Sequence, residues 1–114
     1  MAVYVVNLVI DQGVDFSQIF NLENSITNSV TNLTGYTGAS QLRKHSASSK
    51  SYPFTLSFPD RINGTIKITM TDLQTSRIKP GRYIYDIILT NGDSGLKERV
   101  VEGSVLVREG ATRE

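Results

Sequence analysis

The stretch at residues 65–71 alternates strictly between apolar and polar side chains, and this constrains the fold more than any other feature of the chain. Ile66, Ile68 and Met70 fall on one face, while threonine or lysine occupies the positions between and beside them. A period of two residues is typical of a β-strand with one buried face. Residues 82–90 and 97–108 repeat the pattern over longer stretches. The chain is therefore predicted to fold mainly as β-sheet.

Shorter segments rich in β-branched and aromatic residues predict four more strands, at residues 3–10, 14–22, 36–43 and 51–58. We expect a bulge near residues 17–18, because the apolar alternation slips by one position there. Pro53 removes one amide donor, which predicts an edge position for its strand. Turn residues at 60–64 and 91–95 separate neighbouring strands. Residues 24–34 are mostly Ser, Thr and Asn and predict a long surface loop.

The period changes after residue 71, where a capping residue precedes about one and a half turns of helical pattern. We expect one short helical turn near residues 72–78, lying over the end of the strands. About seven mostly antiparallel strands with turns between them predict an all-β, immunoglobulin-like β-sandwich. A small barrel is the alternative. The chain lacks βαβ alternation, which excludes a doubly wound parallel sheet.

Size and composition limit the classes of function. The 114 residues suffice for one domain, predicted over residues 1–114. No apolar run approaches the roughly 18 residues that span a bilayer, and the N-terminal run lacks the pattern of a signal peptide, so we expect no membrane partner. The absence of cysteine excludes disulfides and thiolate metal sites. A net charge of only +1 does not favour nucleic-acid binding.

The side chains that could take part in catalysis or metal binding do not form a recognisable motif for either. His45 is the only histidine, and no nucleophile motif accompanies it. The eleven acidic residues are scattered singly, and the loop at 91–95 lacks the carboxylates of a calcium site. The sequons at 32–34 and 63–65 are attributed to chance. Arg77, Lys79 and Arg82 form a small basic cluster that we interpret as solvated loop charge. We therefore expect no enzyme activity, cofactor, metal or small-molecule substrate.

Asp86 is the most informative polar residue, because it lies between Ile84 and Ile88 on a strand that is predicted to be central. A buried carboxylate is costly unless it is paired. One hypothesis is a hydrogen-bonded or ion-paired acid, with an arginine as one candidate partner. The other is that this face of the strand contacts a partner chain.

The segment at residues 3–10 is a candidate assembly edge. It has eight residues, no charge and no proline. Val5 and Val9 are its candidate assembly residues. Soluble proteins usually protect exposed strand edges with charge, proline or bulges. The segment therefore pairs either inside the fold or with another chain by strand addition.

The strand faces predict one shared core cluster. Its members fall on the inner faces of three strands: Ile66, Ile68, Met70, Tyr85, Ile87, Val105 and Val107.

The chain contains four short motifs that belong together: QTS at 74–76, PGRYIYDI at 80–87, EGSVLV at 102–107 and ATR at 111–113. DQGVDF at 11–16, LTGY at 33–36 and LRK at 42–44 agree more loosely. Together they resemble a small β-sandwich module of tailed-bacteriophage structural proteins. The module occurs in baseplate, neck and tail-fibre proteins of myovirus-type phages, cyanophages included. Ala111 departs from it, because the module more often has valine there.

The resemblance implies a non-enzymatic role in the virion, as a tail, neck or baseplate component made in the host cytoplasm. Its implied partners are other virion proteins and further copies of the chain. The alternative function is a carbohydrate-binding or adhesion module. Physical reasoning on the shared motif points to Gly81 and Gly103 as positions of close approach, and to Tyr83 or Tyr85 as the tyrosine of a corner motif.

Overall fold

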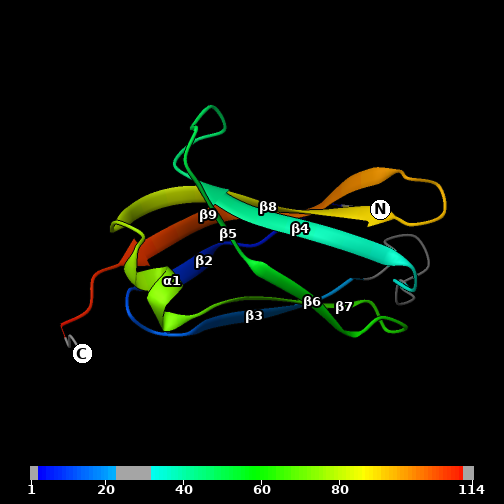
Figure 1. Cartoon of the computed structure of the whole chain (residues 1–114), viewed down its shortest axis with the longest axis horizontal. Helices are drawn as coiled ribbons and strands as arrows, with labels where there is room; N and C mark the ends of the chain where they lie inside the picture. Colours follow the sequence, from blue (N-terminus) through cyan, green and yellow to red (C-terminus); the bar gives the residue numbers. More distant parts are fainter. Residues whose placement is uncertain (1–2, 23–31, 112–114) are drawn as a thin grey trace.

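The computed structural model describes residues 3–22 and 32–111, and these build two β-sheets that face each other (Figure 1). The six-stranded sheet comprises β1 (Tyr4–Val5), β2 (Leu8–Asp11), β4 (Tyr36–Arg43), β5 (Ser51–Pro53), β8 (Gly81–Asn91) and β9 (Lys97–Arg108). The three-stranded sheet comprises β3 (Phe16–Asn21), β6 (Thr55–Asp60) and β7 (Thr65–Met70). One helix, α1 (Asp72–Ser76), covers an end of the sandwich. The all-β prediction is confirmed.

The strand order matches an immunoglobulin-like sandwich. In the six-stranded sheet the order is β1-β9-β8-β4-β5, with β2 also on β9; in the other sheet it is β3-β7-β6. The strands β4, β8 and β9 thus correspond to the C, F and G strands of that fold, and β3, β7 and β6 to B, E and D. The first strands, β1 and β2, run parallel to β9 and extend its sheet.

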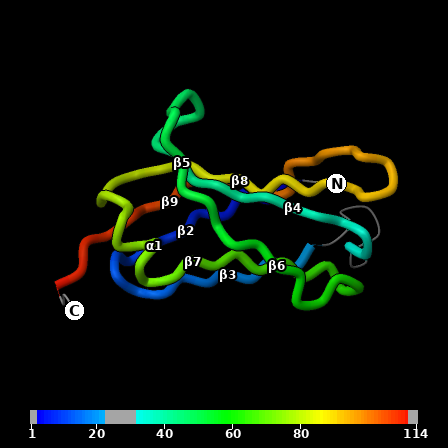
Figure 2. The backbone as a smooth tube through the Cα atoms, in the orientation of Figure 1, coloured from blue at the N-terminus to red at the C-terminus, as the bar shows by residue number. Residues whose placement is uncertain are grey.

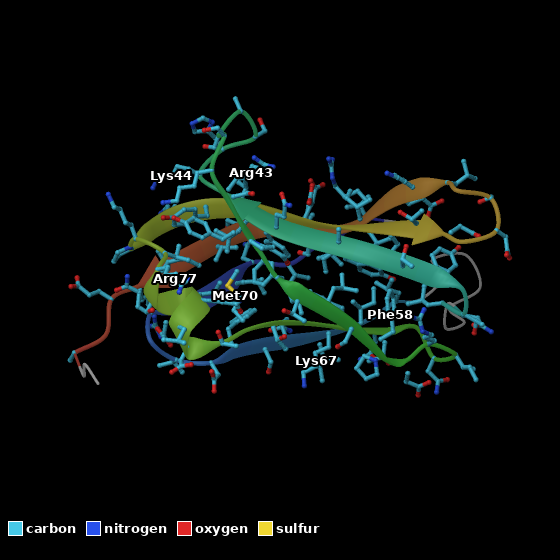
Figure 3. All side chains as sticks on the ribbon, viewed as in Figure 1. Arg43, Lys44, Phe58, Lys67, Met70 and Arg77 are labelled. Carbon is cyan, nitrogen blue, oxygen red and sulfur yellow. The ribbon has the colours of Figure 1, made fainter. Side chains whose placement is uncertain are left out.

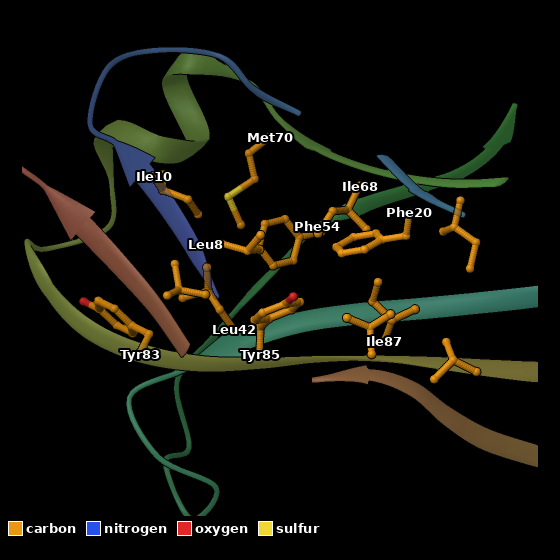
Figure 4. Packing of buried hydrophobic residues seen from close by; sticks show 14 of the residues in the cluster. Leu8, Ile10, Phe20, Leu42, Phe54, Ile68, Met70, Tyr83, Tyr85 and Ile87 are labelled. Carbon is orange, nitrogen blue, oxygen red and sulfur yellow. The ribbon is translucent and has the colours of Figure 1, made fainter. Parts of the chain in front are cut away.

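Figure 4 shows the core between the two sheets, where side chains from both inner faces meet. All seven residues of the predicted cluster are buried there. Figure 3 shows the alternation of β7 directly: Met70 lies between the sheets, while Lys67 points away from them. The alternation of apolar and polar residues in the sequence therefore predicted correctly which face of these strands is buried.

The segment at residues 51–58 is two strands rather than the predicted one. β5 pairs with β4 in the six-stranded sheet, whereas β6 pairs with β7 in the other sheet. Phe54 lies at the crossing, where its buried side chain joins the core and its amide donates to the Ser40 carbonyl at 2.9 Å. The alternation is uninterrupted because both inner faces point toward the same core. Pro53 is exposed in β5, at the predicted sheet edge.

The prediction of a bulge near residues 17–18 is wrong. β3 pairs with β7 in unbroken register, from Phe16 opposite Met70 to Asn21 opposite Thr65. The half-buried Gln18 occupies an inward position, and Ile19 is exposed on the outer face. The inward glutamine and the outward isoleucine interrupt the apolar alternation in the sequence, although the strand pairing does not change.

A bulge does occur in β9, where the sequence did not indicate it. Ile87 lies opposite Val101, but Ile88 lies opposite Arg99, so Val100 is the extra residue. Val100 and Val101 are consequently both buried although they are neighbours. A bulge re-aims one side chain without ending the strand pair.

The helical turn is shorter than predicted, at residues 72–76. Thr71 and Gln74 form a capping box: each side chain accepts a hydrogen bond from the other residue's amide. Buried Thr75 donates its hydroxyl to the Val14 carbonyl at 3.0 Å and accepts from the Gly13 amide at 3.1 Å. These bonds tie the helix to the turn after β2. The predicted 24–34 loop falls largely outside the described residues.

Two connections extend beyond the sandwich (Figure 2). The turn between β4 and β5 rises from the six-stranded sheet, and the hairpin between β8 and β9 extends from one end. In the hairpin, the Gly95 amide donates to the Asn91 carbonyl at 2.8 Å, as expected of the predicted turn.

Candidate assembly surface

The first strand forms an outer edge of the six-stranded sheet. The segment predicted as one strand at residues 3–10 is divided into β1 and β2, yet Tyr4 lies opposite Val101 and Leu8 opposite Val105, so the register is the same on both sides of the break. The break therefore reflects a local change in hydrogen bonding and not a shift of the strand.

Val6 and Asn7 produce that break together. In a regular parallel pair, the Val6 carbonyl would accept from the Ser104 amide. Here the Tyr85 hydroxyl donates to the Val6 carbonyl at 2.6 Å, and Asn7 Oδ1 accepts from the Ser104 amide at 3.1 Å. Asn7 Oδ1 also accepts from the Ser104 hydroxyl at 3.0 Å. The side chain of Asn7 thus takes the place of the backbone acceptor that Tyr85 has engaged.

Gly103 makes this arrangement sterically possible. It lies opposite Tyr85 in the β8–β9 pair and is a position of close approach, as expected. A Cβ atom at this position would clash with the Val6 carbonyl oxygen. Tyr85, Gly103 and the first strand therefore form one structural unit, in which the tyrosine secures the edge strand to the sheet.

The side chains of Val5 and Val9 lie on the outer, solvent-exposed face of the sheet. Val5 is 71% exposed and Val9 49%, whereas Leu8 and Ile10 on the opposite face are buried. The segment is therefore paired inside the fold, as one of the two alternatives from the sequence had it, and its partner is β9. This pairing leaves Val5 and Val9 exposed.

Tyr83 forms a tyrosine corner near the start of β8. Its hydroxyl donates to the Lys79 carbonyl at 2.7 Å, four residues upstream. The Lys44 ammonium lies 5.0 Å from the centre of the Tyr83 ring. Gly81 begins the strand with a φ of 147°, and a Cβ there would lie 2.9 Å from Lys44 Nζ. Figure 3 shows Lys44 at the base of the β4–β5 turn.

Asp86 is partly exposed and not fully buried. Its position between Ile84 and Ile88 lies on the outer face of the sheet, because Tyr85 and Ile87 point inward. The arginine partner is nevertheless present: Arg99 Nε donates to Asp86 Oδ2 at 3.2 Å. An exposed ion pair of this kind contributes about 0–1 kcal/mol. The contact-face hypothesis for this strand remains a prediction.

A second ion pair joins the ends of β2 and β9 and was not anticipated. Arg108 donates two hydrogen bonds to the Asp11 carboxylate, at 2.8 and 3.2 Å. The Arg108 guanidinium holds the pKa of the Asp11 carboxyl below its usual value. The sequence contains both charges, but only the parallel register shows that they are opposite each other.

The two inward tyrosines have altered acidity. Burial raises the pKa of Tyr85 far above its usual value. Burial also raises the pKa of Tyr83, with a further contribution from nearby Tyr52, while Lys50 acts in the opposite direction. Both hydroxyls are therefore held in the neutral form that donates to a backbone carbonyl.

We expect the free energy of unfolding to fall as the pH rises above about 10, the ordinary pKa of tyrosine. The unfolded chain releases these protons there while the folded protein retains them, so the stabilisation is complete below that pH and is lost above it. Urea unfolding across this range should show a steeper loss for the wild type than for the double variant Tyr83→Phe and Tyr85→Phe. The two proteins have the same lysines, so equal slopes would contradict this assignment.

The other candidate residues from the sequence do not come together in one site. His45 is exposed in the β4–β5 turn, and the Arg77, Lys79 and Arg82 side chains are exposed. A wide depression of ≈ 640 Å³ lies between the turn after β2, α1 and the chain after β9. Among residues 3–22 and 32–111, no group of three or more His, Cys, Asp or Glu side chains is arranged to hold a metal ion. No helix in the described part of the chain is long and apolar enough to span a membrane.

Comparison with solved structures finds a phage domain of similar fold. The N-terminal domain of ORF48 from phage TP901-1 aligns with a TM-score of 0.54 and 15% identity, over 95% of this chain and 99% of that domain. InlP from Listeria monocytogenes aligns with a TM-score of 0.48 and 16% identity; the alignment covers 90% of this chain but only 26% of InlP. At such identities the likeness concerns the fold alone. No protein-family model matches the sequence, and no curated protein matches it.

Proposed function

We propose that this chain is a non-enzymatic structural protein of a tailed phage, a component of the tail, neck or baseplate that acts through protein–protein contacts. The observation that carries the proposal is the correspondence, over nearly the full length of both, with the N-terminal domain of a phage protein. The motifs at 80–87 and 102–107 add to it, because they resemble a module of myovirus-type virion proteins. Under this proposal the protein is made in the host cytoplasm and is incorporated into the virion.

The described contacts support a rigid unit for assembly. Tyr83 ties the start of β8 to the preceding turn, and Tyr85 ties β8 to the edge strand. Both bonds are formed by buried side chains, so they restrain the backbone at two points along the same strand. A restrained backbone with exposed apolar residues at its edge is suited to repeated contacts, because little conformational entropy is lost on binding.

Carbohydrate binding has less support. Platforms for sugars use exposed aromatic rings, and the chain has five tyrosines and four phenylalanines. All nine lie within the described residues, and each is buried or partly buried. Their rings pack in the core or against its rim, as in the Phe54–Tyr85 pair at 6.2 Å.

The test is quantitative mass spectrometry of gradient-purified particles of the phage that encodes the chain. We expect its peptides to co-sediment with the particles in a constant ratio to the other virion proteins and to resist a high-salt wash. A gene deletion should yield particles that lack a tail substructure, restored by the wild-type gene in trans. Recovery of the chain only in the soluble lysate, with intact particles from the deletion, would overturn the proposal.

A further inference from the structure

The outer side of the edge strand carries hydrogen-bonding groups directed away from β9. The Val6 amide donates to the Glu102 carbonyl at 2.9 Å, and the Gln12 amide donates to the Arg108 carbonyl at 3.0 Å. Along a strand, the N–H and C=O of one residue point to the same side, and the side alternates from each residue to the next. Even-numbered positions therefore face β9, and Val5, Asn7 and Val9 direct their backbone groups outward.

This side of the strand is not paired within residues 3–22 and 32–111. β1 and β2 lie at the end of the strand order, with β9 as their single partner. The outward positions also carry exposed side chains, since Val5 and Val9 project into solvent. Backbone donors, backbone acceptors and apolar surface thus coincide along one edge that has neither proline nor charge from residue 3 to residue 10. An edge of this kind is a template for another strand.

We propose that this edge pairs with the same edge of a second copy of the chain, in antiparallel orientation about a two-fold axis at Asn7. In this register Val5 of one copy lies opposite Val9 of the other, twice by symmetry. The outward-facing residues of both copies then exchange backbone hydrogen bonds. Opposed valines on one sheet face add favourable side-chain contact.

The charges of the chain are compatible with self-pairing. The net charge is +1, so two copies repel each other weakly. Asp11, at the end of the edge, is already paired with Arg108 of its own chain. A two-fold axis at Val9 instead would oppose Val5 to Gly13 and Asn7 to Asp11, and would leave a single valine pair, Val9 with Val9, in place of two. The sequence of the edge therefore favours the axis at Asn7.

This pairing deepens the proposed assembly role and rests on it, but the two are tested separately. Particle composition tests the role, whereas the mass of the purified chain tests the pairing. A chain that dimerises but is absent from particles would contradict only the role. A chain that is present in particles but stays monomeric would contradict only the pairing.

Cysteine cross-linking tests the register, because the chain contains no cysteine of its own. Opposed residues of an antiparallel pair have Cα atoms about 5.5 Å apart, within the range that a disulfide spans. We expect a mixture of the Val5→Cys and Val9→Cys variants to form covalent dimers on mild oxidation, and each variant alone to form few. Dimers from either variant alone in equal yield, or none from the mixture, would overturn the register.

Light scattering of the purified protein tests the interface itself. We expect the wild type to approach twice its monomer mass of 12.6 kDa as its concentration rises. The double variant Val5→Lys and Val9→Lys should remain monomeric. The matched control, Ile19→Lys and Leu96→Lys, adds the same charge at other exposed apolar positions and should dimerise like the wild type.

Circular dichroism must show that both lysine variants fold. Should the Val5 and Val9 variant be unfolded, Val9→Pro replaces it, since the Val9 amide faces outward and its loss removes no bond to β9. A wild type that stays monomeric at millimolar concentration overturns the proposal, as does a control variant that loses dimerisation together with the edge variant.

Discussion

Replacing Gly103 with alanine is expected to lower the free energy of unfolding by about 2–4 kcal/mol. The new methyl group would clash with the Val6 carbonyl oxygen, which is backbone and cannot move aside as a side-chain tip does. Relief of the clash requires the edge strand to shift from β9, and the shift stretches the bond from the Tyr85 hydroxyl to Val6. Urea denaturation of both proteins measures the loss.

Gly13→Ala is the control for Gly103→Ala. It adds the same methyl group where no atom lies within 4 Å, so its cost is limited to the left-handed backbone strain of about 1–2 kcal/mol. Hydrogen exchange adds a local readout: protection should fall first at the residue 6 and residue 12 amides that bond to β9. A Gly103→Ala protein as stable as the wild type, with these amides still protected, would refute the proposed role of the glycine.

Replacing Ile87 with alanine is expected to cost about 2–5 kcal/mol, the range for deleting a large aliphatic side chain from a packed core. Ile87 is fully buried on the central strand β8, where the two sheets meet (Figure 4). Neighbours on both sheets surround it, so the cavity cannot close by movement of one loop. Thermal and chemical unfolding should both register the change.

Ile84→Ala provides the comparison on the same strand. Ile84 is 44% exposed on the outer face, so the same truncation should change stability by less than about 0.5 kcal/mol. A similar loss for both variants would show that strand propensity, rather than burial, determines the effect. The pair therefore tests the assignment of faces along β8.

Local pattern was sufficient to predict which face of each regular strand is buried. In β7 and β8 the inward residues follow from alternation alone, since successive side chains point to opposite sides. The capping box of α1 and the tyrosine corner at Tyr83 were also foreseeable, because each involves residues only a few positions apart.

Pattern was insufficient where an interaction crosses between distant parts of the chain. Alternation at residues 51–58 is the same whether one strand continues or the chain changes sheets, because both sheets face one core. The position of Asp86 between two isoleucines left open whether its carboxylate is buried or lies on an exposed face. Those isoleucines lie on the outer face, which the sequence does not distinguish from a second inner face.

The amino-acid sequence by itself determined the β class, the inward faces of the regular strands, the turns and the seven core residues, because each follows from the local pattern of side chains. The tertiary structure alone decided the parallel pairing of the first strand with β9, and hence the contacts of Tyr85 with Val6 and of Asn7 with Ser104. These contacts join residues about 80 to 100 positions apart. Their geometry depends on the order of strands in the six-stranded sheet, because that order places the chain's first strand beside its last.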